Sequence, residues 1–408
     1  MKRGYMSFIN FIRLFKMIFN KKQLPNLAWI EKKGLLFVKI AQTFALRIDF
    51  LTPETTLHLQ QLYTRAQKKF DTIEDIRKQF PSELIEEVAN LEDQPIGVAS
   101  IGQVHRATLK NGDIVAIKVI NKNLEKKFLK DVRSFKRFIM FITFFYPKLH
   151  KVADPLGVLE HIESYTLAEL DLSSEIKHTQ ILKDIKHQYE EKFDFTTLDF
   201  PYYYEKLSNK HVLVSNFIEG KPVDQLLRDK ELTQKDMLDI FRWHGFYMFI
   251  VGTFHGDIHP GNIIFNNGVH TLVDTGALSH VSPRIQQGLF EFMKALSMYD
   301  YPMCAQKLNQ MASVSIEGKA YEKFEGKLLH LYKDFAHKSV SEVSLTKQMM
   351  HTIRLGVLSG MTFEKGMFPI IKSLMYLDGI VLQGAPHMIL MEEMRQYINA
   401  FEEAKQHV

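Results

Sequence analysis

The sequence predicts an α+β protein, in which a small lobe of strands and helices is followed by a larger and mainly helical lobe. Three observations predict this class. Turn signals and strand-like alternation gather in residues 94–120 and 212–218, helical periodicity fills residues 27–90 and 122–192, and helical patterns return from residue 231, broken once by a polar segment at 254–265. With 408 residues, 46% of them hydrophobic, the chain can bury a large core.

The composition excludes several classes of protein. A single cysteine, Cys304, rules out an internal disulfide framework and a cysteine-rich metal site, and it fits a reducing compartment. The net charge of +5 is small for this length and does not indicate a nucleic-acid-binding protein. No apolar run reaches the roughly 18 residues of a spanning helix, so the sequence predicts no transmembrane segment.

Residues 1–24 are predicted to form a basic amphipathic helix. In the stretch SFINFIRLFKMIFN, the polar residues Asn10, Arg13, Lys16 and Asn20 recur at helical spacing, which places them on one narrow stripe. A helix this apolar, followed by two lysines, is suited to lie in a membrane interface. Three alternatives compete with this interpretation: docking on its own domain, a signal peptide, and a mitochondrial presequence.

Three further segments complete the predicted organisation. A helical extension covers residues 25–93, with Pro53 and Pro81 each opening a helix. The small lobe covers residues 94–215, and the mainly helical lobe covers residues 216–408.

The small lobe begins with PIGVASIGQVHRATLKNGDIVAIKVI, residues 95–120. Asn111-Gly112 predicts a tight hairpin with a two-residue loop, in which His105 falls opposite Lys118. Ala116 and Lys118 then share one face, where Ala116 leaves room for a flat base and Lys118 reaches the α and β phosphates of a nucleotide. A half-buried strand lysine is costly unless it is paired. The alternative is an edge hairpin whose lysine extends to solvent.

Small residues just before this hairpin favour a loop around phosphate groups. Backbone N–H groups approach a phosphate closely where side chains are small. The predicted nucleotide-contacting residues of this loop are Val98, Ala99, Ser100, Ile101, Gly102 and Gln103.

Lys118 needs a carboxylate partner, and one predicted helix offers three. The segment TLAELDLSSEIKHTQIL, residues 166–182, reads as a helix with acids at Glu169, Asp171 and Glu175. Their spacing does not distinguish which of the three pairs with Lys118, and a solvated acidic face is the alternative.

The segment FHGDIHPGNIIF, residues 254–265, interrupts apolar runs with polar and turn residues. Beyond it, Asn266-Asn267-Gly268 predicts a hairpin, with Asn262 just before its first strand and Asp274 just after its second. Both side chains should emerge at the open end of the hairpin, where an amide oxygen and a carboxylate can share one Mg²⁺ ion.

Asp257 precedes Asn262 by five residues, across a Pro-Gly turn that can fold it back to the same place. A carboxylate there can accept a proton from an attacking hydroxyl or orient a water molecule, and H-x-D-x-x-x-x-N followed by D-x-G is the phosphoryl-transfer apparatus of protein kinases. His255 is expected to brace the loop by hydrogen bonding, and His259 either to reach a phosphate or to pack. The alternative is a buried turn without chemistry.

Taken together, these motifs resemble the UbiB family of atypical kinases, also called AarF-like or ADCK-like. ASIGQVHRA, VAIKV, ELDLSSE, HGDIHPGN and DTG occur in that family's order across residues 30–300. The resemblance implies a bilobal, protein-kinase-like fold with extra N-terminal helices. It also implies ATP and Mg²⁺ as cofactors, and peripheral association with membranes where quinones are made.

The same resemblance implies roles for individual residues. Lys118 corresponds to the nucleotide lysine, Glu175 to the glutamate that holds it, and Asp257 to the catalytic-loop aspartate. Asn262 and Asp274 correspond to the metal ligands. The nucleotide-binding hinge corresponds to Asn216, Phe217 and Ile218, with Asn216 where relatives usually carry an acidic residue.

A regulatory set is also implied by the resemblance. The family's KxGQ signature falls on Lys39 to Gln42, with Ala41 in place of its glycine, and its ExD pair falls on Glu169 and Asp171. In relatives this lysine enters the active site, pairs with the ExD acids and blocks the usual protein-substrate cleft. In addition, DTG replaces DFG, so Thr275 stands where an aromatic side chain packs in relatives.

The resulting hypothesis is an ATP-dependent, phosphotransferase-like enzyme, an atypical kinase or ATPase. It would support isoprenoid quinone (ubiquinone) biosynthesis from the cytoplasm or as a peripheral protein of the inner membrane. Its expected partners are a nucleotide, an isoprenoid quinone precursor or lipid, and a membrane surface, but no nucleic acid.

Three other functions compete with this hypothesis. A small-molecule kinase of the aminoglycoside or choline type also carries an HGD-x-H-x-x-N loop, although it lacks the ASIGQVH loop and the KxGQ-like and ExD elements. The second is a nucleotide-binding scaffold without turnover. The third is a kinase that acts on protein substrates.

Overall fold

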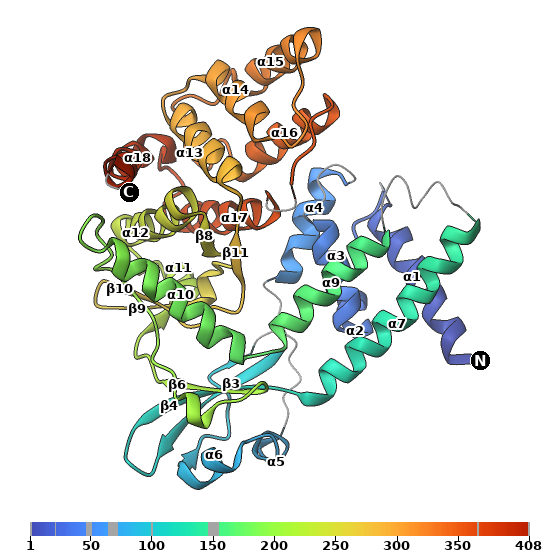
Figure 1. Cartoon of the computed structure of the whole chain (residues 1–408), viewed down its shortest axis with the longest axis vertical. Helices are drawn as coiled ribbons and strands as arrows, with labels where there is room; N and C mark the ends of the chain where they lie inside the picture. Colours follow the sequence, from blue (N-terminus) through green and yellow to red (C-terminus); the bar gives the residue numbers. More distant parts are fainter. Residues whose placement is uncertain are drawn as a thin grey trace. The chain divides into compact units, whose positions relative to one another are not determined.

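The computed structural model describes residues 2–20, 22–45, 51–63, 72–98, 101–145, 155–364 and 367–406 (Figure 1). The chain divides into two compact units. Unit 1 comprises Met1–Lys177 and Tyr202–Phe217, and unit 2 comprises His178–Pro201 and Ile218–Val408. The four segments predicted from the sequence, residues 1–24, 25–93, 94–215 and 216–408, remain a prediction.

An antiparallel sheet lies in unit 1. It contains β1 (Val88–Leu91), β2 (Gly97–Val98), β3 (Gly102–Leu109), β4 (Ile114–Ile120) and β6 (Val212–Asn216), in the order β1-β3-β4-β6 with β2 also paired to β3. Along β3, buried residues alternate with less buried ones, as expected for a strand with one face in a core. That core also receives Ile76 from α5 (Ile73–Arg77) and Leu84 from α6 (Ser82–Glu87).

The β3–β4 hairpin has a register that differs from the predicted one. Val104 lies opposite Lys118, and His105 lies opposite Ile117. The loop holds three residues rather than two, because Leu109 N bonds to Asp113 O and Gly112 adopts a φ of 94°, which favours glycine. One extra loop residue shifts the pairing by one position, so the prediction that His105 faces Lys118 is wrong.

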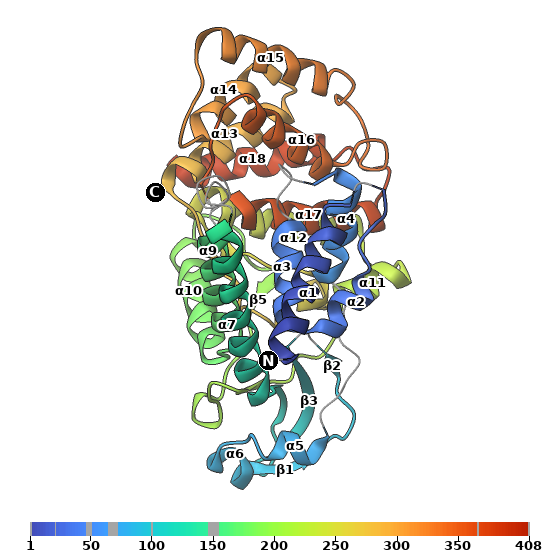
Figure 2. The same cartoon turned by 90° about the vertical axis from the view of Figure 1, so that its right-hand side faces the viewer.

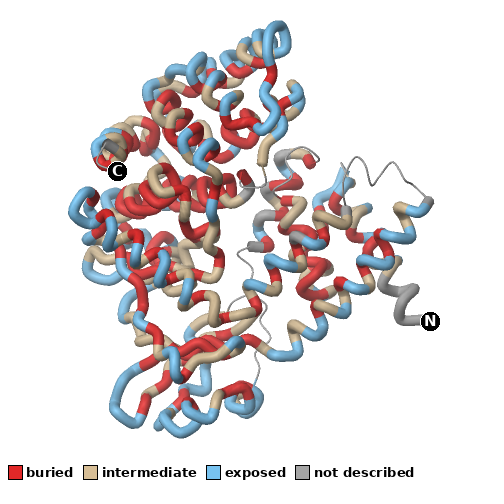
Figure 3. Tube along the Cα trace, viewed as in Figure 1, coloured by how far each residue is buried: buried red, intermediate tan, exposed pale blue. Residues whose placement is uncertain are grey.

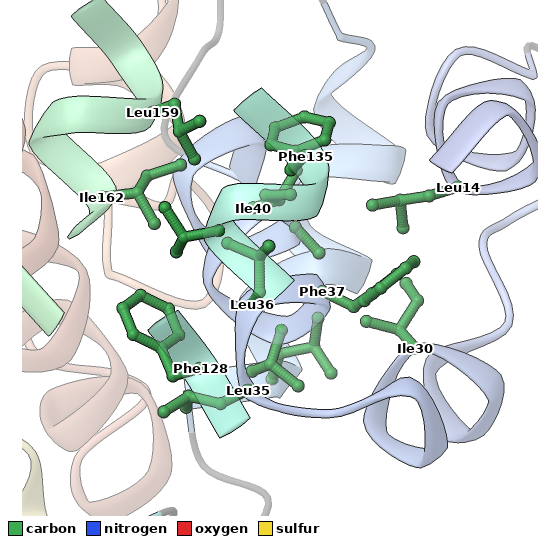
Figure 4. Close-up of a cluster of buried hydrophobic side chains, with 14 of the residues drawn as sticks. Leu14, Ile30, Leu35, Leu36, Phe37, Ile40, Phe128, Phe135, Leu159 and Ile162 are labelled. Carbon is green, nitrogen blue, oxygen red and sulfur yellow. The ribbon is translucent and has the colours of Figure 1, made fainter. Parts of the chain in front are cut away.

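The helices of unit 1 share a second hydrophobic core. They are α1 (Lys2–Ile18), α2 (Leu27–Lys33), α3 (Leu35–Ala45), α4 (Pro53–Gln60), α7 (Lys122–Phe145) and α9 (Pro155–Glu169). In Figure 2, α1, α3 and α7 lie side by side, and the three pairs are in contact. Figure 4 shows apolar side chains from α1, α2, α3, α7 and α9 gathered around Leu36 and Ile40, both of which are buried.

Helix α1 packs on its own unit through one face. Phe11, Leu14 and Ile18 are 0–1% exposed and belong to this core, and the ring of Phe11 stacks on that of Phe37 at 4.9 Å. The opposite face leaves Ile9 and Ile12 exposed, at 52% and 44%. A helix forms within the predicted residues 1–24, but it ends at Ile18. Docking on its own domain explains why one face is buried; it does not explain the exposed Ile9 and Ile12.

The predicted single helix over residues 166–182 is wrong, because the chain breaks it into two. Helix α9 ends at Glu169 and α10 (Ser173–Tyr189) begins at Ser173, so three residues separate the two helices. Asp171 Oδ1 accepts hydrogen bonds from the backbone N and the hydroxyl of Ser173, at 3.1 and 2.5 Å, and Leu172 N bonds to Lys210 O. An aspartate that binds nearby backbone in this way competes with helix continuation.

Helices dominate unit 2. They are α11 (Val223–Asp229), α12 (Gln234–Gly245), α13 (Pro283–Ser297), α14 (Tyr301–Met311), α15 (Gly318–Tyr332), α16 (Leu345–Leu358), α17 (Met367–Gly384) and α18 (Leu390–Gln406). Helix α17 is buried along most of its length (Figure 3). Helix α12 continues as a π-helical segment, Phe246–Val251, and ends at Gly252, whose φ is 75°.

Two small sheets in unit 2 carry the polar segment. One has the order β5-β10-β9-β7, made of β5 (Leu198–Asp199), β10 (Val269–Leu272), β9 (Ile263–Asn266) and β7 (Lys221–Pro222). The other pairs β8 (Thr253–His255) with β11 (Leu278–His280). Among the described helices, none has the length and hydropathy needed to span a bilayer.

Candidate functional site

In unit 1, the structure pairs Lys118 with Glu175. Lys118 Nζ lies 2.5 Å from Glu175 Oε1, and the two side chains are 10% and 3% exposed. Strand β4 supplies the lysine, and the first turn of α10 supplies the glutamate. An ammonium group can be kept this buried only with a charged partner. Of the three acids in the sequence segment, Glu175 therefore occupies the position beside Lys118.

The small-residue loop is described in part. Val98 pairs with Gln103 across β2 and β3, whereas Ala99 and Ser100 lie outside the described residues. Gly102 faces Ile120, and a Cβ placed on it would lie 2.4 Å from Val119 O, so no larger residue fits there. Ile101, next to Gly102, packs against the helical core of unit 1.

Gln103 lies on the sheet face opposite to that of Lys118. Cross-strand partners share a face, and Gln103 pairs with Val119, one residue beyond Lys118. Its amide nitrogen bonds to His105 Nε2 at 2.9 Å, and His105 Nδ1 bonds to Glu92 O. The Gln103 side chain is thus part of the sheet's interior hydrogen bonding.

The predicted hinge begins at the edge of the sheet. Ala116 pairs with Ser215, and Phe217 N donates to Ile114 O at 3.0 Å. Asn216 is held twice by Tyr202, since Tyr202 N donates to Asn216 Oδ1 at 2.7 Å and Asn216 N donates to Tyr202 O at 3.0 Å. Unit 1 ends at Phe217, and Ile218 is the first residue of the following segment of unit 2.

The residues of the KxGQ-like and ExD segments have separate partners. Lys39 on α3 forms an ion pair with Glu169 at the end of α9, with side chains 11% and 16% exposed. Gln42 Nε2 donates to Leu62 O at 3.0 Å. Asp171 bonds to Ser173 at the start of α10, so the structure brings Glu169 to Lys39 while Asp171 caps the next helix.

In unit 2, the β9–β10 hairpin places Asn262 beside the strand that leads to Asp274. The pairing runs from Val269 opposite Asn266 to Leu272 opposite Ile263, and it continues with Val273 N donating to Asn262 O at 3.0 Å. The turn residues Asn267 and Gly268 have φ of 47° and 82°, as a two-residue hairpin loop requires. The predicted hairpin is confirmed, and Asn262 and Asp274 emerge at its open end.

His255 links the two aspartate segments and braces the loop, as predicted. Asp257 N donates to His255 Nδ1 at 3.0 Å. Because that nitrogen accepts, the neutral ring carries its proton on Nε2, which donates to Asp274 O. Burial lowers the pKa of His255, which favours this neutral form. The histidine thus fixes the backbone at both aspartates.

His259 packs within the same loop. Its Nδ1 accepts a hydrogen bond from Gly261 N at 3.0 Å, and its ring meets that of Tyr376 edge to face at 5.3 Å. Burial lowers the pKa of His259. Of the two roles expected for this side chain, the structure shows packing.

Sequence reasoning missed one residue of this loop's surroundings, Lys372 on α17. Its ammonium lies 3.0 Å from Asp257 Oδ1, and the two side chains are 8% and 29% exposed. Burial alone would raise the pKa of Asp257, but the charge and hydrogen bonding of Lys372, together with His255 and His259, offset burial and lower the pKa. A signal was present, since Lys372 and Asp378 are the two charged residues of the mainly apolar segment MFPIIKSLMYLDGIVLQG, and a buried charge requires a partner.

Thr275 of the DTG segment is held by α10. Its hydroxyl lies 2.6 Å from that of Thr179, and His178 Nδ1 lies 3.1 Å from Thr275 O. Both threonines are buried. A pair of hydroxyl groups therefore anchors Thr275, the residue after Asp274. Relatives are expected to carry an aromatic residue at this position, which packs instead of hydrogen bonding.

The donor atoms at the hairpin's open end fit Mg²⁺. Asn262 Nδ2 points to Asp257 O at 3.4 Å, which leaves the amide oxygen as the ligating atom, and Asp274 contributes a carboxylate. Within the described part of the chain, no group of three or more His, Cys, Asp or Glu side chains could hold a metal by itself. Two oxygen ligands from protein suit Mg²⁺, which keeps waters and phosphates in its remaining positions.

Comparison with known proteins assigns the chain to a family. The model of the ABC1 atypical kinase-like domain matches residues 60–308, more than half of the chain. The probable protein kinase UbiB of Shewanella sp. strain W3-18-1 is 25% identical over 384 residues, covering 90% of this chain and 68% of that protein. The AarF domain-containing protein kinase 1 of Xenopus tropicalis is 26% identical over 274 residues, covering 65% of this chain and 49% of that protein.

A solved structure agrees at the level of the fold. That of Rv3197 from Mycobacterium tuberculosis, in complex with erythromycin, aligns with a TM-score of 0.50 and 17% identity over 88% of this chain and 90% of that one. Together with the family match, it confirms the predicted bilobal, protein-kinase-like α+β fold. The resemblance found in the motifs is therefore confirmed, and the chain belongs to the family of ABC1 atypical kinase-like domains, together with proteins named UbiB and AarF domain-containing kinase.

Proposed function

We propose that this protein binds Mg-ATP and catalyses phosphoryl transfer or ATP hydrolysis as an atypical kinase. The observation that carries the proposal is the loop of unit 2, in which His255 ties Asp257 to the Asp274 backbone while Asn262 and Asp274 present oxygen atoms at one end of a hairpin. Such a set combines a carboxylate near the reacting group with ligands for one divalent cation.

Each residue has a distinct task in the proposed reaction. Lys118, held by Glu175, would bind the α and β phosphates. Asn262 and Asp274 would hold Mg²⁺, which when bound neutralises charge that develops on the phosphates. Asp257 would accept the proton of the attacking hydroxyl or orient a water molecule. The predicted contacts of the nucleotide with the segments at 98–103 and 216–218 belong to the same proposal.

We further propose that the activity supports isoprenoid quinone biosynthesis at a membrane surface. The relatedness to proteins named UbiB supports the pathway. Exposed apolar residues on unit 1 support the surface, since Ile9 and Ile12 of α1 and Met140, Phe141 and Phe144 of α7 are all at least 44% exposed. The ring centroids of Phe8 on α1 and Phe141 on α7 lie 6.2 Å apart, so the two helices are in contact beside these exposed residues.

The Lys39–Glu169 ion pair favours a small-molecule acceptor or water over a protein substrate. In the family resemblance, that lysine blocks the protein-substrate cleft, and here it is already bound to the first acid of the ExD pair. An aminoglycoside or choline kinase is a weaker candidate, because the chain retains both of these segments.

The proposal is tested by an ATPase assay on the purified full-length protein, with and without anionic lipid and quinone-precursor analogues. We expect Mg²⁺-dependent ADP release, and its loss by at least tenfold in Asp274→Asn, because the substitution removes a charged metal ligand. Lys118→Ala should weaken nucleotide binding. Unchanged nucleotide affinity in both variants would contradict the site assignment, and binding without turnover in the wild type would favour a scaffold.

A further inference from the structure

Helix α17 supports the catalytic loop from outside the family domain. The match to the ABC1 model ends at residue 308, and α17 begins at Met367. Three of its residues nevertheless contact the HGDIH segment within unit 2: Lys372 pairs with Asp257, Ser373 Oγ approaches His255 O at 3.5 Å, and Tyr376 meets the ring of His259. Positions 372, 373 and 376 lie on one face of a helix.

Stability alone does not explain a lysine at this position. The residue is 6% exposed and belongs to a mainly apolar helix. A buried ion pair is on average no more stabilising than apolar residues of the same shape, because both charges lose their hydration. Asp257 keeps 29% of its side chain exposed, so the carboxylate is accessible on one side while Lys372 contacts it from the buried side.

We propose that Lys372 is a positioning residue of the phosphoryl-transfer centre, which holds the Asp257 carboxylate in the orientation needed to receive a proton. This inference rests on the proposed function. An ammonium at 3.0 Å restricts the rotation of the carboxylate and keeps its second oxygen available for the acceptor. Helix α17 is thus part of the proposed catalytic apparatus, although it lies outside the matched family domain.

The test compares turnover and nucleotide affinity in the full-length protein. Lys372→Met should lower kcat at least tenfold while KM for ATP stays within threefold, because the residue acts on Asp257 and not on nucleotide binding. Lys372→Arg keeps the charge and should recover most of the lost turnover. A merely structural lysine would show no such separation of kcat from KM and no rescue by charge.

Lys294→Met is the matched control. Lys294 also forms an ion pair within unit 2, with Glu402 on α18, and its side chain is 41% exposed. This variant should keep kcat within twofold of the wild type. Thermal unfolding of each variant shows whether it is folded, and if Lys372→Met is not, Lys372→Gln takes its place with the same expectation.

The outcomes separate this inference from the proposed function. A folded Lys372→Met protein with kcat within threefold of an active wild type overturns the inference and leaves the function standing. A wild type that does not hydrolyse or transfer phosphate overturns both. A tenfold fall in kcat with unchanged KM and rescue by Lys372→Arg supports the inference.

Discussion

Most buried polar side chains described in this protein have a hydrogen-bond or ion-pair partner. Several of these pairs lie at the candidate functional site. His255 uses both ring nitrogens, Lys118 and Lys372 each meet a carboxylate, and Asp378 accepts hydrogen bonds from the start of α16. His244 is an exception among the described residues. Its ring is 1% exposed, and Nε2 has no hydrogen-bond partner.

His244 should make the stability of the protein depend on pH. Burial lowers its pKa from 6.5 to about 3, so the folded protein leaves the ring neutral while the unfolded chain protonates it below pH 6.5. The contribution of the neutral His244 ring to the free energy of unfolding is therefore full above pH 6.5 and is lost as the pH falls towards 3. When the pH falls from 7 to 5, the free energy of unfolding of the wild type should decrease because of His244. In His244→Leu this decrease should be smaller by about 2 kcal/mol. Urea unfolding at both pH values measures this, and equal losses would contradict it.

At the scale of elements, the helices and hairpins form where their patterns predict them, but their edges and partners depend on contacts. A hairpin forms at each predicted turn, but the loop at Asn267-Gly268 is one residue shorter than predicted, since Asn266 pairs with Val269, and that at Asn111-Gly112 is one residue longer. Helix α9 ends at Glu169 because Asp171 binds the start of α10. Local turn chemistry determined that a hairpin forms, and the packing of the strands determined its register.

Helix α1 offers a test of the proposed membrane surface. Deletion of residues 1–22 would also remove Phe11, Leu14 and Ile18 from the core, so substitutions on the exposed face are the sharper experiment. We expect the double variant Ile9→Ser/Ile12→Ser to float less with anionic liposomes, because it removes exposed apolar surface, while its stability changes little.

Leu14→Ala is the matched control on the same helix. Leu14 is 0% exposed, so this change should cost about 2–5 kcal/mol of unfolding free energy. Where the protein remains folded, it should leave liposome binding unchanged. Equal flotation of the double serine variant and the wild type would show that the exposed face does not bind the membrane.

At the scale of the whole molecule, the residues to which the proposed reaction gives a role are distributed over the two units of the chain. Lys118 and Glu175 belong to unit 1, and Asp257, Asn262 and Asp274 belong to unit 2. Helix α10 passes from one unit to the other after Lys177, so Glu175 and Thr179 lie on one helix but belong to different units. The chain passes between them again after Pro201 and Phe217.

Because a ligand that binds only the folded state stabilises it, Mg-ATP should stabilise the protein against unfolding. A ligand at about 100 times its Kd adds roughly 2.7 kcal/mol to the free energy of unfolding. We expect the Tm to rise with Mg-ATP and to rise less with ATP and EDTA. In Asp274→Asn the Mg²⁺-dependent part should vanish, while the Ile9→Ser/Ile12→Ser control keeps it. A Tm that does not respond to Mg-ATP in the wild type would argue against nucleotide binding.

The sequence by itself determined the fold class, the family and the order of the chemistry-bearing residues. The fold class, the family and this order can be read from short segments such as HGDIHPGN and NNG, because turn residues and residue spacing depend only on neighbouring positions in the chain. The tertiary structure decided the β3–β4 register, the break at Asp171, the buried face of α1 and the pairing of Lys372 with Asp257. The physical reason is distance along the chain: Lys372 follows Asp257 by more than a hundred residues, and only packing of α17 against the HGDIH segment brings the two charges together.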